Sequence, residues 1–422
     1  MKTDLYFVHC PPYNRNILGL NYVEIGGVSM VSEKGRFWIL IGIVGISGFS
    51  QGMLLPTISI IFEQIGISSS LNGLHATGLY IGILIASPFM EKPVMKLGFK
   101  PIIVIGGILV FLSLFSFTIW DSMFIWFILR MLIGIGDQML HFGSQTWITT
   151  TVSEKTRGRS VALYGLSFAL GFAMGPLMTR LLEINEALPF IISAFLTMSM
   201  WSLIFLVRNE WPNQEENPLQ TVSSIGRFTQ SIKYAWVAFL PALCYGFLEA
   251  TLHGVFPVYG LRIGHDVNIL SFIIPCFAIG SMITQLPLGM LSDRIGRRKT
   301  LIYVIIAGAI CFTLAALFET SVVALFILFL VAGMFVGSVF SLGVAYMADL
   351  LPTSLLPAGN VMIGIWFSIG SIAGPFLGGL FIEVLPEVSF FYLIVVILIV
   401  VLAAMFFKKD QERFKNEKQP LT

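Results

Sequence analysis

Apolar residues fall into twelve long runs along the chain, separated by short polar segments. The runs cover residues 37–61, 71–90, 101–119, 123–150, 159–182, 187–207, 234–259, 267–291, 300–318, 321–347, 359–382 and 388–407. Each holds about 20 residues or more, enough for a helix to cross the hydrocarbon core of a bilayer. The pattern therefore predicts an all-α polytopic membrane protein with twelve transmembrane helices.

A polar segment divides these runs into two sets of six. We expect a six-helix bundle over 30–207, a cytoplasmic linker over 208–233, a second six-helix bundle over 234–407 and a basic cytoplasmic tail over 408–422. Residues 1–29 contain no signal-peptide apolar core. We interpret them as a non-structured leader or as a mis-annotated start, with Met30 as the first translated residue.

The composition supports a membrane protein. Hydrophobic residues make up 56% of the 422 residues and charged residues only 11%, under half of the roughly 25% typical of a soluble domain. The net charge of +2 gives no reason to expect a nucleic-acid partner. Three of the four cysteines lie inside apolar runs without metal-ligand spacing, so we expect no metal site.

Lysine and arginine predict the orientation. If both termini are cytoplasmic, 22 of the 25 lysines and arginines lie in the tails and cytoplasmic loops. The sequence thus predicts a multi-pass protein of the cell membrane with both termini in the cytoplasm. We expect it to be bacterial, because the codons of residues 25–28 can form a bacterial ribosome-binding sequence shortly before Met30.

The two sets of runs also repeat one another. Residues 158–176 match 358–375, and the pairs are Gly165 with Gly364, Gly171 with Gly370, Gly175 with Gly374 and Pro176 with Pro375. Nearly the same offset relates other parts of the two sets, including KLGFK (96–100) and RIGRR (294–298). The chain is therefore predicted to form two pseudo-symmetric six-helix bundles.

The loop GMLSDRIGRRKT (289–300) concentrates charge between two apolar runs. It resembles the signature loop of the major facilitator superfamily. The resemblance implies a transporter rather than an enzyme, a monomer in the lipid bilayer with a small-molecule substrate. It also implies a cytoplasmic gate, whose expected residues are Gly289, Asp293, Arg294, Arg297 and Asp349. Met95, Phe99 and Thr150 stand at the positions equivalent to Asp293, Arg297 and Asp349, so the gate is not expected to be symmetrical.

Ionisable residues inside membrane spans are costly and indicate function. Arg130, Asp137 and His141 point within about 20° of one direction on a helix. We predict Asp137 as the proton carrier, Arg130 as its modulator and Glu249 as the second candidate, since burial in a low-dielectric cavity favours a protonated carboxyl group. The alternative is a structural ion pair of Arg130 with Asp137 or Glu249. Further cavity candidates are Gln51, His141, Tyr245 and His253.

Glycine-rich spans suggest the direction of transport. Gly171, Gly175 and Pro176 resemble the antiporter motif of drug-efflux members, and Thr179 and Arg180 stand where that motif ends in two glycines. The fuller form lies at Gly370, Gly374, Pro375, Gly378 and Gly379. We expect proton-coupled efflux of small hydrophobic or amphiphilic compounds, with the proton gradient as energy source and no cofactor. The alternatives are a flippase for a lipid-linked sugar, an importer, and a non-transporting sensor or scaffold; tight helix packing without directional meaning also explains the glycines.

Overall fold

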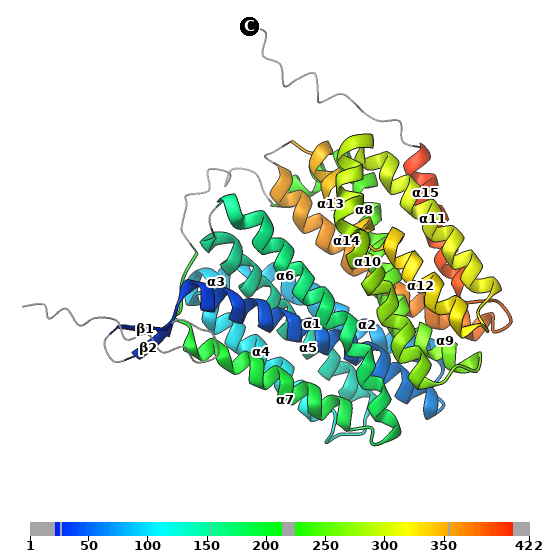
Figure 1. The fold of residues 1–422 in the computed structure, drawn as a ribbon, viewed down its shortest axis with the longest axis horizontal. Helices are drawn as coiled ribbons and strands as arrows, with labels where there is room; N and C mark the ends of the chain where they lie inside the picture. Colours follow the sequence, from blue (N-terminus) through cyan, green and yellow to red (C-terminus); the bar gives the residue numbers. More distant parts are fainter. Residues whose placement is uncertain (1–21, 26–27, 153, 213–223, 353–354, 408–422) are drawn as a thin grey trace, which may run out of the picture.

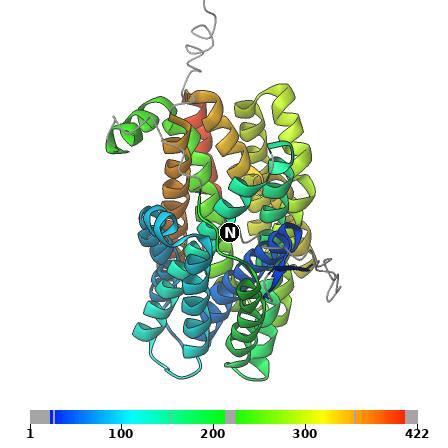
Figure 2. The same cartoon turned by 90° about the vertical axis from the view of Figure 1, so that its left-hand side faces the viewer.

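The computed structural model describes residues 22–25, 28–152, 154–212, 224–352 and 355–407. Figures 1 and 2 show two bundles of helices packed against each other, one coloured blue to green and the other green to red. In lipid, every backbone N–H and C=O group must find its partner inside the protein. Long apolar runs therefore fold as helices, and these helices cover all twelve predicted runs.

The first half forms the blue-to-green bundle. Its elements are α1 (Glu33–Gln64), α2 (Ser69–Ala86), η1 (Ser87–Phe89), α3 (Glu91–Leu97), α4 (Phe99–Ser116), α5 (Met123–Thr151), α6 (Glu154–Met174), η2 (Gly175–Glu183), α7 (Leu188–Ser202) and η3 (Leu203–Leu206). The elements labelled η are 3₁₀ helices. The fifth span changes from α6 to η2 at Gly175 and Pro176 because proline has no N–H for the helical ladder.

The second half forms the green-to-red bundle. Its elements are α8 (Ser224–Gly254), α9 (Phe256–Arg262), α10 (Val267–Ile295), α11 (Arg297–Leu317), α12 (Val322–Val336), α13 (Val339–Leu350), α14 (Leu356–Val384) and α15 (Phe391–Phe407). The seventh span is thus α8 with α9, and the tenth is α12 with α13. Each half has its own large cluster of buried apolar side chains.

By length and composition, ten helical stretches of the described residues can each cross a membrane. Helix α2 has 18 residues and the shorter apolar α15 has 17, and these two fill the remaining predicted runs. Before the first span, Tyr22–Ile25 and Val28–Val31 pair as an antiparallel hairpin. Residues 1–21 of the expected leader and the basic tail 408–422 lie outside the described residues.

The repeated glycines join equivalent helices in the two halves. A Cβ atom added at Gly171 of α6 would lie 1.9 Å from the carbonyl oxygen of Gly45 in α1. A Cβ atom added at Gly370 of α14 would lie 2.0 Å from the carbonyl oxygen of Leu243 in α8. Only glycine permits backbone contact this close. The glycines of both repeats therefore fix the packing of the first and seventh spans.

Gly175, Gly374 and Gly378 extend these contacts toward the ends of the same helices. Gly175 packs on Met53 of α1, and Gly374 and Gly378 pack on Thr251 of α8. Pro176 is the second residue of η2, whereas Pro375 lies inside the continuous helix α14. The antiporter-like motif thus has at least a packing role in this structure.

Candidate functional site

Asp137 lies near the middle of α5, where its side chain is fully buried. The hydroxyl of Ser47, on α1, donates a hydrogen bond of 2.6 Å to its Oδ1 atom. Gln51, one turn further along α1, is a second polar neighbour of the carboxyl group. The Oδ2 atom has no hydrogen-bond partner among the described residues. An acid held in this way can bind a proton or a polar group of a substrate.

His141 lies one turn after Asp137 and extends the polar cluster to α6. Its Nε2 atom lies 3.4 Å from the hydroxyl of Ser47, and its Nδ1 atom lies 2.7 Å from the hydroxyl of Tyr164. Tyr164 also donates to the backbone carbonyl of His141 at 3.2 Å. Sequence analysis predicted no polar contact for Ser47 or Tyr164, because their partners come from different helices.

Arg130 is fully buried on α5, two turns before Asp137. Its Nη2 atom donates to the carbonyl oxygens of Leu54 at 3.3 Å and Leu55 at 3.5 Å. Its Nε and Nη1 atoms have no partner among the described residues, and none of the ion pairs found there includes Arg130. The expected common face exists, but the alternative of an ion pair with Asp137 or Glu249 is absent from this conformation.

The second half contributes residues from α8. Glu249 and Tyr245 are half-buried, whereas His253 is 1% exposed and its Nδ1 atom lies 2.9 Å from the carbonyl oxygen of Glu249. The ring of His253 lies 4.3 Å from the ring of Phe172 in the first half. Tyr80, on α2, is an electrostatic neighbour of both Arg130 and Glu249. Tyr80 therefore lies near a charged residue of each half, a position that sequence analysis did not predict.

The expected gate residues meet in the second half. Arg297 lies between two acids, with its Nη2 atom 2.6 Å from Oδ1 of Asp293 and its Nε atom 3.4 Å from Oδ2 of Asp349. Its Nη1 atom donates to the hydroxyl of Ser292 at 2.8 Å. Asp293 and Asp349 remain well exposed, and Arg294 is exposed on the same turn.

Gly289, the first of the expected gate residues, makes no close helix contact in this conformation. Nothing lies within 4 Å of a Cβ atom added there. The surrounding part of α10 is exposed, including Leu286 at 76% and Met290 at 56%. This end of α10 therefore has no partner helix close to Gly289 in the conformation described.

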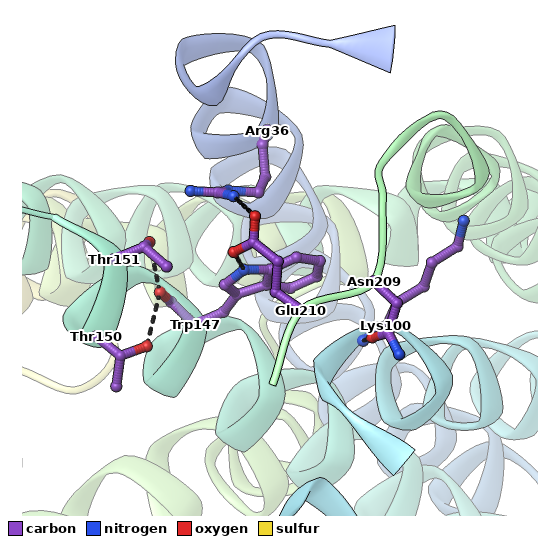
Figure 3. Close-up of polar contacts among 7 residues, drawn as sticks. All are labelled: Arg36, Lys100, Trp147, Thr150, Thr151, Asn209 and Glu210. Carbon is purple, nitrogen blue, oxygen red and sulfur yellow. Dashed lines mark hydrogen bonds and ion pairs between the residues drawn. The ribbon is translucent and has the colours of Figure 1, made fainter. Parts of the chain in front are cut away.

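In the first half, the start of the linker contacts the region that corresponds to the triad of Asp293, Arg297 and Asp349 in the second half (Figure 3). Glu210 forms an ion pair with Arg36 of α1 and accepts a hydrogen bond of 2.8 Å from the indole N–H of Trp147 in α5. Trp147 is fully buried and stacks on Phe99, with ring centroids 5.4 Å apart. Phe99 is the residue that aligns with Arg297, so aromatic stacking takes the place of the charged triad.

The same linker residues cap the start of α4. The backbone N–H of Phe99 donates to the carbonyl oxygen of Glu210 at 2.9 Å, and that of Lys100 donates to Oδ1 of Asn209 at 3.0 Å. These N–H groups have no acceptor inside the helix. We call residues 207–210 with Arg36, Phe99, Lys100 and Trp147 the linker clasp, and the end of the molecule that holds it the linker end.

Polar contacts join the two halves at the opposite, far end. Arg262 of α9 pairs with Glu63 of α1 at 2.7 Å, and Arg180 of η2 donates to Asn268 of α10 at 2.9 Å. The backbone N–H of Ser70 donates to Glu383 at 2.9 Å. Three basic residues lie outside the tails and the loops predicted to be cytoplasmic: Arg130, Arg180 and Arg262. The last two of these exceptions could have revealed the contacts at this end.

Glycines allow close contact between the halves at this far end. A Cβ atom added at Gly73 of α2 would lie 2.1 Å from the carbonyl oxygen of Pro375 in α14. One added at Gly379 of α14 would lie 2.1 Å from the carbonyl oxygen of Ser69. Ser59 also donates to the carbonyl oxygen of Gly254 at 2.6 Å. We call this contact of α2 and α1 with α14 and α8 the far-end seam.

The sequence and the fold were compared with those of known proteins. The family model described as the Major Facilitator Superfamily matches residues 40–275 and 238–421. The MFS-type transporter YfkF of Bacillus subtilis (strain 168) is 52% identical over 359 residues, which cover 85% of this chain and 92% of the relative. Multidrug resistance protein 1 of the same organism is 26% identical over 84% of this chain and 91% of the relative.

Solved structures share the fold at low sequence identity. The nucleoside transporter NupG gives a TM-score of 0.73 at 14% identity and covers 89% of this chain and 100% of its own. A bacterial homologue of the human lysosomal transporter Spinster, in an inward-facing and unoccupied conformation, gives 0.71 at 16% identity over 89% and 97%. The family match and the 52% identical relative span most of the chain. The chain is therefore a multi-pass membrane transporter that belongs to the major facilitator superfamily.

Proposed function

We propose that this transporter is a proton-coupled antiporter that exports small hydrophobic or amphiphilic compounds across the cell membrane, with both termini in the cytoplasm. The proton gradient is its energy source, and Asp137 carries the proton. The observation that carries this proposal is the environment of Asp137: it is fully buried, it has one hydroxyl donor, and one carboxylate oxygen has no partner among the described residues. Burial of such a group inside a membrane span costs free energy, so its presence there indicates a function.

Arg130 supports the proposal as a modulator. Because it makes no ion pair with Asp137 in this conformation, it does not hold the carboxylate permanently ionised. Its partner-free Nε and Nη1 atoms leave it able to attract a carboxylate in another state of the cycle, which favours release of a proton. Glu249 is the second acid and lies on the other half, near Tyr80.

Efflux is favoured by the antiporter-like glycines and by the relative named as a multidrug resistance protein. In this proposal the linker end faces the cytoplasm. The far-end seam then closes the outer side in the conformation described, and the substrate enters from the cytoplasm. Alternating access would separate the far-end seam and close the linker end around α10.

The proposal is tested in everted membrane vesicles, with the fluorescent cation ethidium as the probe and an acid lumen. We expect the wild type to accumulate ethidium in the lumen and nigericin to abolish this accumulation, because each step exchanges a lumenal proton for a probe molecule. Asp137→Asn cannot bind a proton and should lose the accumulation. Proton-driven uptake in right-side-out vesicles instead would identify an importer and reject export.

A further inference from the structure

A line of hydrogen-bonding groups leads from Asp137 toward the linker end. Helix α5 runs toward that end, because Trp147 near its last turn contacts Glu210. His141 is therefore one turn closer to the linker end than Asp137. Ser47 lies between the two side chains, 2.6 Å from Oδ1 of Asp137 and 3.4 Å from Nε2 of His141.

We propose that Ser47 and His141 relay the proton from Asp137 to water at the linker end, and that Tyr164 positions the imidazole for this step. The inference rests on the proposed function of Asp137 as the proton carrier. It adds two relay residues and one positioning residue, none of which is needed for Asp137 merely to bind a proton.

Tyr164 determines which nitrogen faces Ser47. Its hydroxyl hydrogen is directed to the carbonyl oxygen of His141 at 3.2 Å, so its oxygen is free to accept from Nδ1 at 2.7 Å. The neutral imidazole then has its proton on Nδ1 and its lone pair on Nε2, because a neutral ring has one donor and one acceptor nitrogen. The lone pair therefore faces Ser47. Phe168 packs its ring edge-on at 4.8 Å and holds the imidazole from the other side.

The transfer balances as one proton. When Asp137 is protonated, its O–H donates to Ser47 and the hydroxyl of Ser47 donates to Nε2 of His141. The Asp137 O–H bond breaks as a new O–H bond forms on Ser47, and the original Ser47 O–H bond breaks as an N–H bond forms on Nε2. Asp137 is then ionised and His141 is an imidazolium, which returns to the neutral ring by losing one N–H proton to water. The hydroxyl of Ser47 is left donating to Asp137, the direction seen in the structure.

Burial and neighbours favour this route. Ser47 and Asp137 are fully buried, so water does not reach the carboxyl group in this conformation, whereas His141 is half-buried. Facing the carboxyl group, α1 offers the neutral side chains Ser47 and Gln51, and α4 packs on Gly136 through Gly106 and Val110.

The other charged and titratable groups near this site lie further from the carboxyl group of Asp137. Arg130 lies two turns away on α5, near Tyr80 and His75 of α2. On α6, Tyr164 reaches the carboxyl group only through His141. Within the described part of the chain, Ser47 is thus the only side chain for which hydrogen-bond contacts to both Asp137 and a titratable ring are found.

The test uses purified protein in proteoliposomes, ethidium as the probe and an imposed pH gradient. The measured quantities are the initial rate against pH and the ratio of rates in H₂O and D₂O. Ser47→Ala should lower the proton-driven rate by about 100-fold or more, since positioned proton transfer contributes about 10²- to 10⁴-fold. Ser47→Thr retains the hydroxyl and should restore the rate. Tyr164→Phe removes only the hydroxyl and should shift the pH profile.

Ser50→Ala is the matched control. Ser50 lies on the same helix and is equally buried, but its hydroxyl contacts that of Thr197 at 3.0 Å and not the relay residues. The transport rate of Ser50→Ala should therefore stay within about twofold of the wild-type rate. Wild-type rates and pH profiles in Ser47→Ala and Tyr164→Phe would overturn the relay, as would equal losses in Ser47→Ala and Ser50→Ala. Asp137→Asn distinguishes failure of the relay from failure of the proposed function. If this variant loses proton coupling while Ser47→Ala keeps it, the relay is wrong and the proposed function stands. If Asp137→Asn keeps coupling, both fail.

Discussion

Substitution of Gly73 by alanine tests whether the far-end seam is a contact that must separate during transport. The added Cβ atom would lie 2.1 Å from the carbonyl oxygen of Pro375 and 3.2 Å from the Cα atom of Gly379. Both neighbours are backbone atoms of α14, which cannot rotate away as a side chain can. Ordinary contact distances then require α2 and α14 to move apart by about 1 Å.

The cost of this clash falls only on conformations in which the far end is closed. Overpacking of this kind typically costs about 1–3 kcal/mol. Because an open far end does not bear this cost, the ratio of open to closed molecules should rise about 5- to 150-fold. The variant should therefore fold normally and shift its conformational equilibrium.

A cysteine at position 76 reports the shift. Ala76 is fully buried and its Cβ atom lies 3.4 Å from a Cβ atom added at Gly254 across the seam. In Ala76→Cys, the labelling rate with a membrane-impermeant maleimide should rise at least about fivefold when Gly73→Ala is added. Gly364→Ala is the control, since nothing lies within 4 Å of its added Cβ atom, and it should not raise the rate. Equal labelling with and without Gly73→Ala would refute the reasoning.

Two further predictions concern the linker clasp and are measured as melting temperatures in detergent. Glu210→Ala leaves the buried indole of Trp147 without its charged acceptor and should cost about 2 kcal/mol, whereas Glu186→Ala, at an exposed site, should leave the melting temperature unchanged; equal melting of the two variants would contradict the clasp. Gly98 and Gly296 are equivalent glycines with φ of 85° and 96°, so alanine at either costs about 1–3 kcal/mol in backbone strain. Only at Gly98 would the Cβ atom also strike the linker, 2.5 Å from Asn209, so Gly98→Ala should melt lower than Gly296→Ala, and the reverse order would contradict this account.

The membrane architecture could be predicted from the sequence because it depends on local properties. Apolar runs, basic loops and a repeated glycine pattern each act through their own segment, and the expected runs correspond to α1 through α15. The meeting of Asp293, Arg297 and Asp349 could also be expected, since the motif and the repeat fix their places. The contacts of Gly171 and Gly370 follow from the same repeat.

The remaining features depend on how distant segments meet. Glu210 follows the last helix of the first half, and nothing in its local sequence indicates that it reaches Arg36 and Trp147. The hydrogen bond from Ser47 to Asp137 joins residues 90 positions apart. Whether another helix contacts Gly289 depends on the conformational state, which no local sequence pattern specifies. Arg180 and Arg262 were exceptions to the distribution of lysine and arginine among the loops, but that distribution does not predict which residues they contact.

Proton-driven ethidium transport by Asp137→Asn tests the central claim most directly. Asparagine keeps the shape of the side chain and can still interact with Ser47, but it cannot carry a proton. The account predicts that an imposed pH gradient drives ethidium transport by the wild-type protein and not by a folded Asp137→Asn protein. Undiminished gradient-driven transport by the variant would contradict it.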